Sequence, residues 1–72
     1  MQRRYIMTIT DENTSAMIIQ IPNDKFPMIC ERYSTEQLKT YVLRILEREK
    51  WSITENHVFA VLNQLEMELH YN

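Results

Sequence analysis

Residues 34–50, STEQLKTYVLRILEREK, decide the fold because they carry the clearest structural signal in the chain. Ser34 and Gln37 have the spacing of a capping box, in which each side chain bonds the backbone amide of the other residue. Apolar residues then recur every three or four positions, as on one face of a helix: Leu38, Tyr41, Val42, Ile45 and Leu46. The segment predicts an amphipathic helix over about residues 35–50.

The residues that follow predict a second helix over about residues 54–70. Thr54 is a candidate N-cap, and Ser52 with Glu55 forms a rival capping box two residues earlier. The apolar stripe of this helix consists of Val58, Val61, Leu62, Leu65 and Leu69. Because the linker over residues 51–53 is short, we expect the two helices to be antiparallel or sharply angled neighbours.

The residues before the helices alternate between apolar and polar, which is the pattern of a strand. Residues 3–10 and 16–21 both follow it, and the stretch between them is polar and rich in turn-forming residues. If Thr10 faces Ala16, one face of the pair carries six apolar residues: Tyr5, Met7, Ile9, Met17, Ile19 and Ile21. We therefore predict a β-hairpin over about residues 3–21.

Residues 22–33 give mixed signals. Pro22 removes a backbone donor and ends the second strand, and Pro22 with the next two residues is typical of a turn. Residues 28–32 are compatible with a short third strand, which Pro27 restricts to a sheet edge or a strand start. We expect an irregular segment or such an edge strand here. The order of elements is then ββαα, and the fold class is α+β.

Length and composition place the chain among small soluble globular proteins. The 72 residues, of which 44% are hydrophobic and 25% charged, fit a single α+β domain over residues 1–72. A domain of this size has a thin core. The chain contains no glycine, which excludes the glycine-rich phosphate loops of nucleotide-binding folds. The net charge of -2 does not favour binding to nucleic acid.

The cysteine count and the hydropathy pattern predict a cytoplasmic protein without a membrane segment. Cys30 is the only cysteine in the sequence, so it cannot form an intramolecular disulfide, and a lone thiol fits a reducing compartment. The basic and then apolar N-terminus is closed by Asp11 and Glu12 without a small-residue cleavage site, unlike a signal peptide. The longest apolar run, residues 16–19, is far shorter than the roughly 20 residues that span a bilayer.

The residues that could carry chemistry do not form a recognisable site. His57 and His70 are 13 positions apart, roughly 20 Å along one helix, so they cannot share a metal ion. Glu66 and His70 form a single i, i+4 pair, which is usually a surface interaction. Cys30 has no neighbouring histidine or Cys-x-x-Cys motif to activate it, although a small thiol-dependent enzyme would predict fast alkylation of this residue. We expect no enzyme activity, no cofactor and no metal.

Several apolar residues fall outside the rows that one copy of the fold can bury. These are Leu43, Phe59 and Met67 on the helices and Ile6 and Ile18 on the hairpin face opposite the main apolar row. Such a surplus favours an interaction surface. We predict a non-enzymatic protein-interaction or regulatory module, homodimeric, that binds a protein partner through an apolar helical face. Tyr41 and Trp51 are candidate anchors, since aromatic residues concentrate binding energy.

The alternative function is a nucleic-acid-associated regulator. Its phosphate contacts would come from arginines that dimerisation assembles into one stripe, namely Arg3, Arg4, Arg32, Arg44 and Arg48. The absence of Lys and Arg from residues 51–72 argues against a recognition helix there. Small size, lack of glycine and lack of catalytic chemistry together suggest a compact accessory protein of the kind that bacterial and phage genomes encode.

Overall fold

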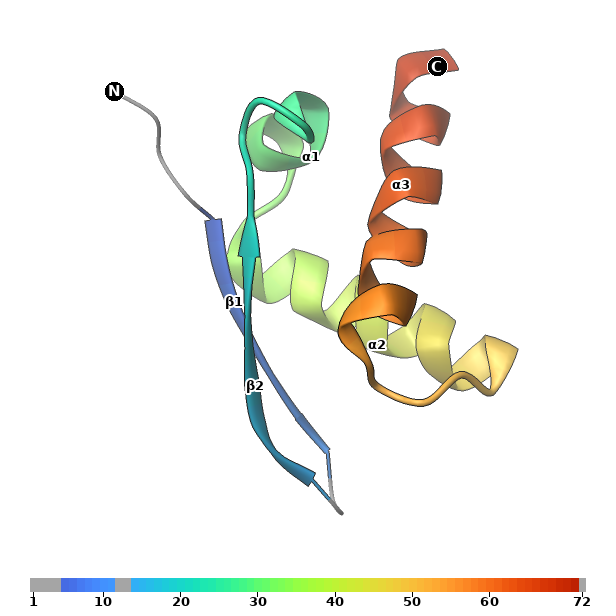
Figure 1. The fold of residues 1–72 in the computed structure, drawn as a ribbon. Helices are drawn as coiled ribbons and strands as arrows, with labels where there is room; N and C mark the ends of the chain where they lie inside the picture. The colour runs from blue at the N-terminus through green and yellow to red at the C-terminus, as the bar shows by residue number, and fades with distance from the viewer. Residues whose placement is uncertain (1–4, 12–13, 72) are drawn as a thin grey trace.

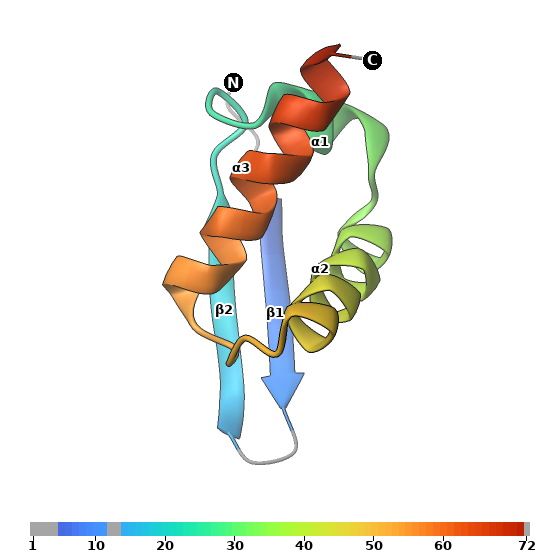
Figure 2. The same ribbon diagram turned by 90° about the vertical axis from the view of Figure 1, so that its right-hand side faces the viewer.

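A computed structural model describes residues 5–11 and 14–71 and confirms the α+β class. The elements, in chain order, are β1 (Tyr5–Asp11), β2 (Thr14–Ile21), α1 (Pro27–Arg32), α2 (Thr35–Glu49) and α3 (Glu55–Tyr71). Figures 1 and 2 place the three helices on the same side of the hairpin, with α1 beyond the end of β2. The start of the predicted hairpin and the middle of its predicted loop, residues 12–13, lie outside the described residues.

The two strands pair antiparallel in the predicted register. Tyr5 lies opposite Ile21, Met7 opposite Ile19, and Ile9 opposite Met17. The register shifts between Ile9 and Asp11, because Asp11 pairs with Thr14. Such a shift marks a β-bulge, which increases the local twist of the hairpin near its loop.

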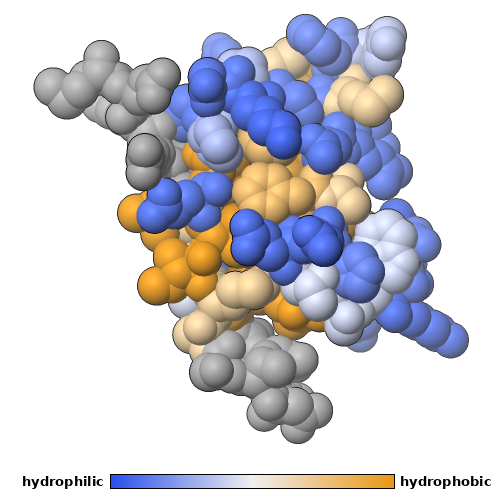
Figure 3. All heavy atoms as spheres, viewed as in Figure 1, coloured by the Kyte–Doolittle hydropathy of each residue, from blue (hydrophilic) through white to orange (hydrophobic). Residues whose placement is uncertain are grey.

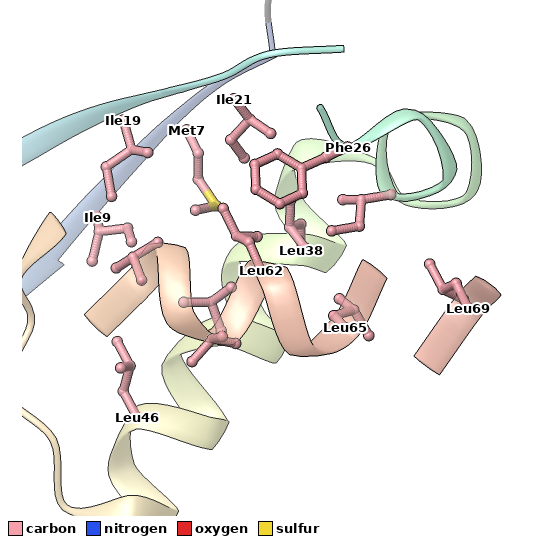
Figure 4. Close-up of a cluster of buried hydrophobic side chains, with 14 residues drawn as sticks. Met7, Ile9, Ile19, Ile21, Phe26, Leu38, Leu46, Leu62, Leu65 and Leu69 are labelled. Atoms are coloured by element: carbon pink, nitrogen blue, oxygen red, sulfur yellow. The ribbon is translucent and has the colours of Figure 1, made fainter. Parts of the chain in front are cut away.

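The inner face of the hairpin packs against the helices and forms the core (Figure 4). Four side chains of the predicted apolar row are buried, namely Met7, Ile9, Ile19 and Ile21. Met17 is partly buried against this cluster. Both predicted helical stripes face the same cluster, with Leu38, Val42 and Leu46 from α2 and Val58, Val61, Leu62, Leu65 and Leu69 from α3. The hydrophobic periodicity of the sequence thus assigns the buried side of the two strands and of α2 and α3 correctly.

The capping box predicted for α2 is confirmed. The Ser34 hydroxyl accepts a hydrogen bond from the Gln37 amide at 3.2 Å, and the Gln37 side chain accepts one from the Ser34 amide at 3.1 Å. The helix ends at Lys50, whose φ of 59° and ψ of 35° are left-handed. The Trp51 amide reaches back to the Leu46 carbonyl at 2.9 Å, and the Lys50 amide donates to the carbonyl of Glu47 at 3.1 Å. This is a Schellman ending with lysine at the position that usually holds glycine.

The start of α3 follows the first of the two predicted alternatives. The Thr54 hydroxyl accepts a hydrogen bond from the amide of His57 at 3.2 Å, as expected for an N-cap. Ser52 has a different role, because its backbone carbonyl lies 2.8 Å from Nδ1 of His57. The corner between α2 and α3 is therefore tied to the first turn of α3 by one side-chain cap and one ring nitrogen.

Residues 22–33 differ from the sequence prediction. Residues 27–32 form the helix α1, so they are neither an irregular segment nor the short edge strand that we predicted for residues 28–32. Pro27 occupies the beginning of the helix, where the missing amide proton costs nothing and the fixed φ is already helical. The preceding turn is closed by the Phe26 amide, which donates to the Pro22 carbonyl at 3.0 Å.

The cause of this difference lies on α3. The Glu66 carboxylate accepts hydrogen bonds from the backbone amides of Met28 and Ile29, each at 3.1 Å. These amides belong to the first turn of α1, where a helix has no internal acceptors of its own. Phe26, at the N-cap position, makes no side-chain cap bond. A side chain 37 and 38 residues further along the chain therefore caps α1.

We expect Glu66→Ala to lower the free energy of unfolding by about 1–2 kcal/mol, because two partly buried amides lose their acceptor. Urea unfolding followed by circular dichroism measures this change. Glu68→Ala is the matched control, since Glu68 is exposed on the same helix, and it should change the stability by less than about 0.5 kcal/mol. Equal losses in the two variants would contradict the capping role of Glu66.

Candidate functional site

The three apolar helical residues predicted for an interaction surface differ in how far their own chain covers them. Leu43 is half-buried and packs against the core. Phe59 is also half-buried, and its ring centroid lies 6.1 Å from that of Phe26, with the Lys25 ammonium 5.7 Å from the Phe59 ring centre. Met67 is 58% exposed. Of these three residues, only Met67 is left mainly uncovered.

The predicted anchor Trp51 lies at the corner between α2 and α3. Its ring stacks on that of His57, with a centroid distance of 5.3 Å and an interplanar angle of 17°, and 38% of the residue is exposed. Nδ1 of the same histidine ring bonds the Ser52 carbonyl, which fixes the orientation of the ring in the stack. The structure therefore places Trp51 in the corner between α2 and α3, stacked on the first turn of α3.

Sequence alternation correctly indicated a second apolar surface on the hairpin. We call it the hairpin outer face, and it consists of the exposed residues Ile6, Thr8, Ala16, Ile18 and Gln20. Ile6 is 55% exposed and Ile18 66% exposed. Ile6 pairs with Gln20 and Ile18 pairs with Thr8, so the two isoleucines are diagonal neighbours across the strands. Figure 3 shows hydrophobic atoms gathered along the side of the molecule where the hairpin lies.

A hollow lies along the outer side of α2, and sequence reasoning did not identify it. This tyrosine hollow has a volume of about 420 Å³ and is lined by Tyr33, Glu36, Gln37, Thr40, Tyr41 and Arg44. The two tyrosine rings have centroids 6.2 Å apart and are tilted by 40°. The spacings of three, four and seven residues from Tyr33 are present in the sequence, but Tyr33 precedes the helix, so the helical periodicity of α2 does not include it.

The arginines of the nucleic-acid alternative lie on different parts of the fold. Arg32 is exposed in the last turn of α1, whereas Arg44 and Arg48 are exposed one turn apart on α2. The Arg48 Nε atom lies 3.5 Å from a carboxylate oxygen of Glu49. The other two predicted arginines, at positions 3 and 4, lie outside the described residues. Within those residues, the arginines are divided between two helices, and the two on α2 are interleaved with carboxylates.

Cys30 is the fourth of the six residues of α1, a helix that the sequence did not reveal. Partial burial, with a smaller contribution from the negative charge of Glu66, raises the pKa of the Cys30 thiol. The neutral thiol is therefore the form present at neutral pH, and it is a poor nucleophile.

The chain matches no family model, no curated protein and no solved structure. Over residues 5–11 and 14–71, no three side chains of His, Cys, Asp or Glu are grouped closely enough to hold a metal ion. The helices described in those ranges include none whose length and apolar content would let it cross a bilayer.

The raised thiol pKa predicts slow alkylation of Cys30. At neutral pH the rate with iodoacetamide should fall below that of a free cysteine in a short peptide, because less thiolate is present. The rate should rise as the pH approaches the raised pKa, and mass spectrometry of quenched samples follows both changes. Glu66→Gln removes one cause of the shift and should raise the rate at a given pH. Alkylation faster than that of the peptide thiol would contradict this assignment and revive a thiol-dependent activity.

Proposed function

We propose that this protein is a non-enzymatic interaction module of a regulatory or accessory kind, and that it works as a homodimer. The observation that carries the proposal is the hairpin outer face, where two isoleucines are more than half exposed on the side of the hairpin away from the helices. This location differs from the apolar helical face that the sequence suggested, since Leu43 and Phe59 are half-buried within their own chain.

A second copy of the chain is the occupant that best suits the hairpin outer face. None of its five residues is charged, so two such faces can meet without burying a charge or bringing like charges together. A two-fold axis through the face would place the same residues on both sides of the contact. The diagonal arrangement of Ile6 and Ile18 then allows the isoleucines of one copy to pack against those of the other.

The size of the face indicates a weak and reversible dimer. Covering the exposed parts of four isoleucines contributes roughly 4–7 kcal/mol, at about 1.5–3 kcal/mol for each fully buried side chain. Association costs at least about 4 kcal/mol in lost translational and rotational freedom, which removes most of this gain. Regulation suits such a dimer, because a modest change in concentration shifts the balance between one copy and two.

We expect sedimentation equilibrium to show a monomer at low micromolar concentration and a growing dimer fraction towards millimolar concentration. Ile18→Lys should abolish the dimer while the circular dichroism spectrum stays that of the parent, because the replaced side chain faces outwards. Ile6→Thr is the milder second variant, retains a β-branched residue in the strand, and should weaken the dimer.

Met67→Lys is the matched control, since Met67 is exposed to a similar degree on α3. It should leave the dimer unchanged. A parent protein that stays monomeric throughout would refute the homodimer. If Met67→Lys dissociates the dimer and Ile18→Lys does not, the dimer interface is on the helical face that includes Met67.

The nucleic-acid alternative makes a different prediction, which an electrophoretic shift assay at low salt tests. Binding through phosphate contacts would be strong at low salt and would fall steeply as salt rises. We expect no retention of duplex DNA or of single-stranded RNA, because Glu36, Glu47 and Glu49 share α2 with Arg44 and Arg48. Salt-sensitive retention that Arg44→Gln reduces would establish the alternative.

A further inference from the structure

The tyrosine hollow has one negative and one positive end. Glu36 lies in the first turn of α2, and Arg44 lies eight residues later on the same helix, which is about 12 Å along the helix axis. An ion pair needs the two groups within about 4 Å, so these charges do not neutralise each other. Neither forms an ion pair with another side chain in the described parts of the chain, whereas the neighbouring Arg48 pairs with Glu49.

Two other polar groups of the hollow are hydrogen-bonded to nearby backbone groups. The side-chain oxygen of Gln37 is held by the capping box, at 3.1 Å from the Ser34 amide. The Thr40 hydroxyl donates to the Glu36 carbonyl at 3.0 Å. Glu36 and Arg44 are both exposed, so their charged groups are accessible to a ligand, with the half-buried rings of Tyr33 and Tyr41 beside them.

These features together fit a short length of extended polypeptide. An extended chain advances about 3.3 Å per residue, so side chains four residues apart are separated by about 13 Å. This is close to the rise of about 12 Å along α2 from Glu36 to Arg44. The side chain midway between them points to the same face of the extended chain, because the strand period is two. It would therefore lie against the tyrosine rings.

We infer that the tyrosine hollow binds an extended peptide segment of a partner protein, in which a basic and an acidic side chain stand four residues apart with an apolar side chain midway. The basic group lies at Glu36, the acidic group at Arg44, and the apolar side chain on the two rings. This site lies on α2 and does not include any residue of the hairpin outer face, so it does not depend on the homodimer.

The probe is the peptide Lys-Ser-Phe-Ser-Glu with an acetylated N-terminus and an amidated C-terminus, titrated into the uniformly ¹⁵N-labelled full chain. We expect saturable amide shifts centred on residues 33–44, with a dissociation constant in the high micromolar to millimolar range because exposed ion pairs are weak. Two control peptides carry lysine at both ends or glutamate at both ends. Each keeps one of the two charge contacts and should bind more weakly.

Arg44→Glu should weaken binding of the probe about fivefold, because one attraction becomes a repulsion. Arg48→Glu is the matched control, since Arg48 is exposed one turn further along α2 and does not line the hollow. It should leave the dissociation constant unchanged. The R44E variant should bind the peptide with lysine at both ends more tightly than the parent does, which is a gain that damage to the fold cannot produce.

Absence of saturable shifts around the hollow, or equal weakening by R44E and R48E, would overturn the peptide site. Repeating the titration with Ile18→Lys separates this inference from the proposed dimer. The expected result is the same dissociation constant in that variant. A loss of peptide binding there would show that the hollow is complete only in the dimer and would refute its independence.

Discussion

The position of α1 depends on the Glu66 carboxylate. The helix is only six residues long, has no acidic residue in its first turn and receives no cap from Phe26, so Pro27 is its only local stabilising feature at the start. Glu66 supplies two acceptors and a negative charge from α3. With α1 bound to α3 in this way, Phe26 and Ile29 lie in the core. Tyr33, in the connection from α1 to α2, lies beside Tyr41. The shape of the tyrosine hollow therefore depends on a contact made elsewhere in the fold.

The parts of the fold that could be predicted are those whose signals are local. Strand alternation fixes the pairing of Met7 with Ile19, and the capping box together with the apolar period fixes α2. The helix α1 could not be predicted, because its stabilising partner lies 37 and 38 residues away and Pro27 is equally compatible with a strand start. Local sequence patterns do not predict a hydrogen bond between segments that are distant in the sequence.

The difference between local signals and contacts of distant segments also explains which exposed residues could be predicted. Exposure of Ile6, Ile18 and Met67 follows from position on a strand or helix, so the sequence indicated it. Phe59 packs against the core with its ring close to that of Phe26, a residue that the unforeseen turn and helix bring there. The hairpin outer face and the tyrosine hollow also differ physically. The first is neutral and depends on removal of water from apolar groups, whereas the second presents separated charges and so responds to ionic strength.

In the part of the chain that the structure describes, the backbone takes a left-handed conformation at Lys50, in the corner after α2. A lysine therefore occupies a position that usually holds glycine. This arrangement costs about 1 kcal/mol relative to glycine. It also belongs to a chain that has no glycine at any position. Glycine enlarges the range of shapes open to an unfolded chain, so its absence narrows that range and lowers the entropy lost on folding. In a small domain with a thin core, the lower conformational entropy of the unfolded chain stabilises the fold. This contribution cannot be seen in the contacts of the native state.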